Sequence, residues 1–154
     1  MSPTVAMVDL TLTALDTPDL PAIRRVLHKH RLAPSGIFLA GSLIDNRPLT
    51  FESSYLGPEA TSFYGQIFQA EPGPQLCRLV FELAVAGPLL VSVSPGPPHL
   101  VVCGDGIDVR DVTDESVPPW LEVVAVVDTP SELERALTGE WGEFRSTFGD
   151  RYWG

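Results

Sequence analysis

Prolines and glycines are spread along the whole chain, and they limit what it can fold into. The 154 residues include 15 prolines and 13 glycines. Proline ends helices and is poorly tolerated in central strands, while glycine favours turns. The chain is therefore expected to form many short elements joined by tight turns. Because its length matches that of one ordinary domain, residues 1–154 are predicted to form a single α+β domain.

Two segments are predicted to be helices, and each begins at the tripeptide Asp-Thr-Pro. The first tripeptide, residues 16–18, precedes a helix expected over residues 18–31, with the residue before the proline as its cap. The second tripeptide, residues 128–130, opens a helix that is expected to close at Gly139. In this second helix Thr129 and Glu132 have the spacing of a capping box, in which each satisfies a backbone N–H near the helix start.

The other apolar segments have the alternation or the length of strands. In residues 76–85, for example, apolar side chains alternate with Arg78 and Glu82, which is typical of a half-buried strand. The run 121–127 is apolar on both faces, so it is placed centrally in the sheet. The predicted sheet has six to eight mainly antiparallel strands, with two to three helices, the two main ones on one face, and a short terminal helix within residues 140–154. The expected strands are 5–15, 37–44, 49–55, 62–70, 76–85, 89–94, 99–103 and 121–127.

Charge is distributed unevenly between the two ends of the chain. The formal net charge is −10, of which −8 lies in residues 101–154. A field of this sign repels nucleic acid and anionic membranes and attracts a basic protein.

No apolar run approaches the roughly 20 residues of a membrane-spanning helix, and the first residues lack the basic start of a signal peptide. Together with two thiols expected to stay reduced and unpaired, this predicts a cytoplasmic protein.

Acidic and aromatic residues in the last third of the chain form the main candidate binding site. An acidic segment punctuated by glycine and proline is followed by all three tryptophans of the chain. Carboxylates steer a basic partner, and tryptophan is a frequent anchor of protein interfaces. The three-residue spacing of the carboxylates does not fit a calcium loop, so no metal is predicted. The candidate partner-binding residues are Asp105, Asp108, Asp111, Asp114, Glu115, Trp120, Trp141 and Trp153.

Basic residues gather in the second half of the first predicted helix. These residues are Arg24, Arg25, Lys29 and Arg31. Residues 20–34 contain no acidic residue. Cations near a helix C-terminus complement the helix dipole, and this structural role is one interpretation. The alternative is a weak anion-binding site for a small anion or an acidic peptide.

The sequence favours a protein without catalytic activity. It contains no G-x-S-x-G, H-E-x-x-H, C-x-x-C, P-loop or G-x-G-x-x-G motif, and no cofactor is predicted. The one conceivable nucleophilic pair combines His99 with Cys77 or Cys103. Since Cys77 lies in the apolar phase of its segment, it is expected to be buried and unreactive.

Size, acidity and α+β class together indicate a protein that binds and masks a basic protein partner. In this general profile the chain resembles antitoxin-type immunity proteins, which neutralise a basic nuclease or deaminase. Two alternatives remain open. One is a small-molecule-binding or enzymatic domain with a pocket under the Pro/Gly-rich loops. The other is a homo-oligomeric scaffold in which the basic helix of one copy meets the acidic tail of another.

Overall fold

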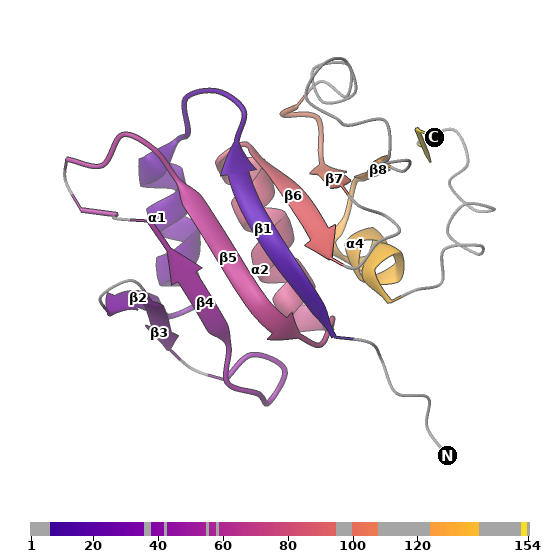
Figure 1. The fold of residues 1–154 in the computed structure, drawn as a ribbon, viewed down its shortest axis with the longest axis horizontal. Helices are drawn as coiled ribbons and strands as arrows, with labels where there is room; N and C mark the ends of the chain where they lie inside the picture. Colours follow the sequence, from indigo (N-terminus) through magenta and orange to yellow (C-terminus); the bar gives the residue numbers. More distant parts are fainter. Residues whose placement is uncertain are drawn as a thin grey trace.

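The computed structural model describes residues 7–35, 38–41, 43–54, 56–57, 59–94, 100–107, 124–138 and 152–153. These residues form one sheet and three helices (Figure 1). The strands are β1 (Val8–Ala14), β2 (Leu32–Ser35), β3 (Phe38–Gly41), β4 (Thr50–Ser53), β5 (Tyr64–Ala70), β6 (Leu89–Ser94), β7 (Leu100–Cys103), β8 (Val124–Val127) and β9 (Tyr152–Trp153). The helices are α1 (Leu20–Lys29), α2 (Pro74–Ala86) and α4 (Pro130–Leu137).

The sheet is built outward from β1, which pairs with β5 on one side and β6 on the other. Its strand order is β2-β3-β4-β5-β1-β6-β7-β8-β9, and neighbours are antiparallel except for the parallel pair β7 and β8. In β1 the side chains of Leu10 and Leu12 are fully buried, while Asp9, Thr11 and Thr13 on the other face are half-buried. The α+β class and the mainly antiparallel pairing are thus confirmed. The described residues form nine strands, one more than the predicted maximum.

The three helices lie side by side behind the sheet, with α2 between α1 and α4 (Figure 1). Their apolar stripes and the inward residues of the strands form one core. The most buried side chains of that core include Ile23 of α1, Leu83 of α2 and Leu133 of α4. Among the described helices, none is long and apolar enough to cross a membrane.

The largest error of the sequence analysis concerns α2, because residues 76–85 were predicted as a strand. Strict alternation would place Val80 on the polar face and Val85 on the buried face. In the structure Val80 is fully buried and Val85 is 46% exposed, because the segment is helical. Pro74 occupies the first turn of that helix, where its missing N–H costs nothing. The buried residues recur at helical spacing, namely Leu76, Cys77, Leu79, Val80, Leu83 and Ala84.

Two smaller predictions about the elements were also wrong. Helix α1 begins at Leu20 and not at residue 18, since Asp19 is its N-cap and accepts a hydrogen bond from the Ala22 N–H. The run 121–127 is not central, because β8 is the second strand from one end of the sheet. The terminal helix expected within residues 140–154 falls mostly on residues 139–151, which lie outside the described residues; residues 152–153 form strand β9.

The second helix start is confirmed in detail. Thr129 is the N-cap of α4, and its Oγ1 accepts a hydrogen bond from the Glu132 N–H at 3.1 Å. The Glu132 carboxylate accepts in return from the Asp128 N–H at 2.7 Å. This is the reciprocal pattern of a capping box. The one difference is that the second N–H belongs to the residue before the N-cap and not to the N-cap itself. Strands β6 and β7 pair antiparallel, in agreement with the mainly antiparallel sheet that the sequence predicts.

Helix α2 is capped by a residue far from it in sequence. Its own N-cap, Gly73, has no side chain to offer. Asp45, in the turn before β4, fills this role: its carboxylate accepts hydrogen bonds from the N–H groups of Gln75 and Leu76, both at 3.0 Å. The Asp45 N–H in turn donates a hydrogen bond to Gln75 Oε1. A Cβ on Gly73 would lie 2.5 Å from the Asp45 carboxylate, so a larger residue there would have to displace this carboxylate.

Replacing Asp45 with Ala is expected to destabilise the protein by about 1–2 kcal/mol, the usual cost of losing a helix N-cap. Urea unfolding followed by circular dichroism measures this change. Gly73→Ala should also destabilise, because the added methyl group pushes the Asp45 carboxylate away from α2. Asp16→Ala is the matched control, since Asp16 is exposed and should change stability by less than about 0.5 kcal/mol. An equal effect of Asp45→Ala and Asp16→Ala would contradict the capping role.

Candidate binding surfaces

The predicted acidic and aromatic site is only partly within the described residues. Asp105 lies exposed in the turn that follows β7, and Trp153 belongs to β9 at one end of the sheet. Trp153 pairs with Val124 at the start of β8, whereas Asp105 follows the end of the parallel strand β7. The structure therefore places these two residues at opposite ends of the β7–β8 pair. Outside the described residues lie Asp108, Asp111, Asp114, Glu115, Trp120 and Trp141.

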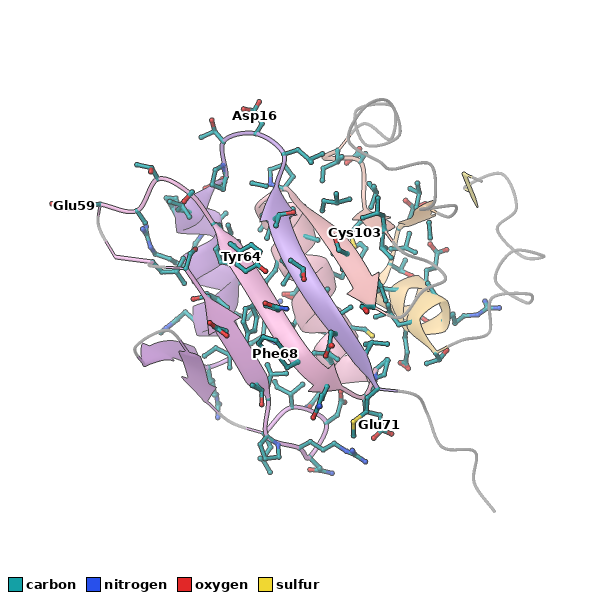
Figure 2. All side chains as sticks on the ribbon, in the orientation of Figure 1. Asp16, Glu59, Tyr64, Phe68, Glu71 and Cys103 are labelled. Carbon is teal, nitrogen blue, oxygen red and sulfur yellow. The ribbon has the colours of Figure 1, made fainter. Side chains whose placement is uncertain are left out.

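The sheet presents a second surface, which we call the open face: the side of β4, β5, β1 and β6 opposite the helices. No described helix or strand covers it (Figure 2). A row of polar residues crosses it, because Glu52 of β4 pairs with Gln66 of β5, Gln66 with Thr11 of β1, and Thr11 with Ser92 of β6. All four side chains are half-buried. This part of the sheet therefore offers carboxylate, amide and hydroxyl groups to a partner.

Two aromatic residues stand on the same face, one on each side of that row. Tyr64 and Phe68 flank Gln66 along β5, and both are labelled in Figure 2. Tyr64 is 46% exposed, and its hydroxyl donates a hydrogen bond to Gln66 Oε1 at 3.2 Å. The Tyr64 N–H is in turn bound to the Ser54 hydroxyl at 3.0 Å, which helps to hold this end of β5. An exposed ring on rigid backbone is a typical interface anchor.

The charges on the strands are all of one sign. The nine described strands contain Asp9 and Glu52 but no lysine or arginine. Asp9 accepts a hydrogen bond from the Gln69 N–H at 2.7 Å, where the β1–β5 register shifts. Glu52 forms no ion pair with any described residue. The open face is therefore acidic, although it lies outside the acidic segment chosen from sequence.

Toward β6, β7 and β8 the same face becomes apolar. Leu90, Leu100 and Val102 are buried there and pack with Ile107 and Val126 as a small cluster separate from the main core. Thr13 of β1 pairs with Leu90, so this cluster borders the polar rows directly.

The four basic residues predicted to bind an anion have different roles in the structure. Arg24 donates to two backbone carbonyls, those of Leu56 at 2.9 Å and Gly57 at 3.0 Å, and so ties α1 to the segment between β4 and β5. Arg25 lines a groove of about 480 Å³ between α1 and α2. Lys29 forms an ion pair with Glu82 of α2 at 2.9 Å. Arg31 follows the end of α1 and is exposed.

Glu82 also has a second partner, the C-cap residue of α1. The ring Nε2 of His30 lies 3.2 Å from its carboxylate. Burial alone would raise the pKa of Glu82, but hydrogen bonds and charge from Lys29 and His30 outweigh this effect and lower the pKa below its usual value. Glu82 is therefore ionised at neutral pH and joins the middle of α2 to the end of α1.

The two cysteines are free and buried, as predicted, although Cys77 lies in a helix and not in a strand. Burial, with smaller contributions from Glu134, Asp45 and Cys103, raises the pKa of the Cys77 thiol far above its ordinary value. Burial raises the pKa of Cys103 to about 12. Neither thiol is therefore a thiolate at neutral pH, the form that nucleophilic catalysis needs. His99 lies outside the described residues. Within the described part of the chain, no group of three or more His, Cys, Asp or Glu side chains could hold a metal ion.

Sequence reasoning missed the open face, although a signal for it was present. Residues 62–70 were predicted to be a strand, and in such a strand Tyr64, Gln66 and Phe68 must share one face. What the sequence did not indicate was that all three helices lie on the other side.

Comparison with protein-family models, with characterised proteins and with solved structures finds no match.

Arg24→Gln is expected to destabilise the protein by about 1–3 kcal/mol, because it removes charge-assisted hydrogen bonds to two carbonyls. Arg25→Gln removes the same charge one residue away on an exposed position, and should cost less than about 0.5 kcal/mol. Urea unfolding of both variants separates the two roles. If Arg24 only complemented the helix dipole, the two variants would differ by no more than a few tenths of a kcal/mol.

Both thiols should react slowly in the folded protein. Alkylation by iodoacetamide, followed by mass spectrometry, is expected to be ~100-fold or more slower than in concentrated guanidinium chloride. Raising the pH from about 7 to 9 should accelerate the unfolded reaction much more than the folded one, since the raised folded pKa values lie above that window. Rapid labelling of either cysteine at neutral pH would restore the nucleophile hypothesis.

Proposed function

We propose that this protein is a non-catalytic binding module that covers a basic surface of another protein, in the manner of an immunity protein. The observation that carries the proposal is the segregation of charge in the sheet. The open face has carboxylates and exposed aromatic and hydroxyl groups but no cation, and no described element shields it.

The two kinds of group on this face would contribute differently. Glu52 and the residues of the acidic segment would steer a basic partner and raise the association rate. Tyr64 and Phe68 would supply most of the energy that holds the complex, since buried aromatic rings dominate most interfaces. Thr11, Gln66 and the other polar side chains of the row that crosses the open face would form hydrogen bonds with the partner around these two rings.

The state of the thiols supports a binding role and a reducing environment. Both are buried and protonated, so the nucleophiles that sequence analysis considered for an enzyme are held in an unreactive form. Free thiols are also normal in the cytoplasm, where disulfides are rare. The proposed setting is therefore a cytoplasmic complex between this acidic protein and its basic partner.

A cationic peptide provides a first test of the binding surface. Titration of the isotopically labelled protein with an oligo-arginine peptide should shift the backbone NMR signals of β4, β5 and β1, and those around Asp105. Glu52→Gln should weaken this binding. Glu59→Gln is the matched control, because Glu59 lies exposed on the loop between β4 and β5, away from the open face (Figure 2).

The partner itself provides the second test, after affinity capture from the source organism. Tyr64→Ala is expected to speed dissociation by an amount corresponding to about 2 kcal/mol or more, while Glu52→Gln should slow association and flatten its salt dependence. Surface plasmon resonance separates the two rates. If the captured partner binds both variants as it binds the Glu59→Gln control, the open face is not the binding surface.

A further inference from the structure

The helix layer contains a cationic pocket. It has a volume of about 230 Å³ and lies where the end of α1 meets the first turns of α2. Three cations line it from different parts of the chain: Lys29 from α1, Arg31 from the turn before β2, and Arg78 from α2. No carboxylate lines it. The pocket is separate from the open face, so the inference does not rest on the proposed function.

The cations of this pocket are not neutralised equally. Lys29 is paired with Glu82, and His30 faces the same carboxylate. Arg31 and Arg78 are both exposed and form no ion pair with any residue that the structure describes. Two guanidinium groups of the pocket therefore have no ion-pair partner among the described residues. A guanidinium group can bind an oxyanion through two parallel hydrogen bonds.

Further lining residues favour a ligand with several oxygens and an apolar part. The Gln75 side chain accepts the Asp45 N–H through Oε1, so its amide NH₂ remains as the group that can donate into the pocket. Leu43, which is 55% exposed, and the buried Ile44 add an apolar wall. Donors beside an apolar wall suit a phosphate group carried by a small organic molecule.

The backbone of Arg31 points independently to a role for its side chain. Arg31 has a φ of 60° and directly follows His30, the C-cap of α1. This left-handed position after a helix is usually occupied by glycine, because a Cβ is unfavourable there. Arginine at this position makes the fold less stable than glycine would, which is understandable if the guanidinium is needed in the pocket.

We propose that Arg31, Arg78 and Lys29 form a binding site for the phosphate group of a small molecule. A phosphate carries a charge of about −1.5 to −2 at neutral pH, which matches the two unpaired guanidinium groups. A single carboxylate would leave one of them uncompensated.

Thermal unfolding in sodium phosphate, compared with sodium chloride at equal ionic strength, tests the site. Phosphate should raise the Tm of the native protein, since a ligand that binds only the folded state stabilises it. Arg31→Gly is the most informative variant. It should raise the Tm without ligand by about 2–4 °C, as relief of the left-handed strain predicts for a chain of this size, and it should lose the phosphate-dependent increase.

Arg78→Gln keeps the test independent of any effect on the turn at Arg31. In isothermal titration it should weaken the binding of phosphate and of phenyl phosphate by at least about tenfold, the loss expected for a charge-assisted pair. Arg25→Gln, on the same helix as Lys29 but outside the pocket lining, is the matched control and should keep full binding. Tighter binding of phenyl phosphate than of inorganic phosphate would identify an organic monoester as the ligand class, and equal binding would identify the free anion.

Three results would overturn the proposal. The first is a phosphate effect no larger than that of chloride. The second is a phosphate effect that persists in both Arg31→Gly and Arg78→Gln. The third is equally tight binding of malonate, because a dicarboxylate would then satisfy the site as well as a phosphate does.

Discussion

Burial of α2 is the interaction on which the arrangement of this protein depends. The helix lies against the sheet and touches both other helices, and its residues Leu79, Val80 and Leu83 are fully buried. Since all three helices gather on the α2 side, the strands have one buried face and one open face. The alternation of apolar and polar residues in β1 and β5 is the sequence counterpart of this one-sided cover.

The position of α2 also connects two parts of the molecule that bear charge. At its start, Asp45 caps the helix from the turn before β4. In its middle, Glu82 receives Lys29 and His30 from α1. These two contacts place Arg78, which lies between them in the sequence, next to the end of α1. The basic helix α1 and the acidic open face thus lie on opposite sides of the sheet.

The elements that the sequence predicted well carry local signals. The capping residues of α4 and the alternation of β1 depend on neighbours a few positions away, and both are found in the structure. Residues 76–85 failed because the same apolar residues fit a period of two and a helical period almost equally. Tertiary contacts favour the helix, among them the cap that Asp45 supplies from 30 residues away. The open face was missed for a similar reason: Tyr64, Gln66 and Phe68 share a face in any strand, but only the placement of the helices leaves that face uncovered.

The two ends of the sheet have a consequence for how copies of this chain meet. The outermost strands are β2 and β9. Strand β2 has four residues and includes Pro34, which has no N–H to donate, and β9 has two residues. Short edges and an edge proline give an incoming strand little backbone to pair with. Growth of the sheet from one molecule to the next is therefore disfavoured at these two described edges.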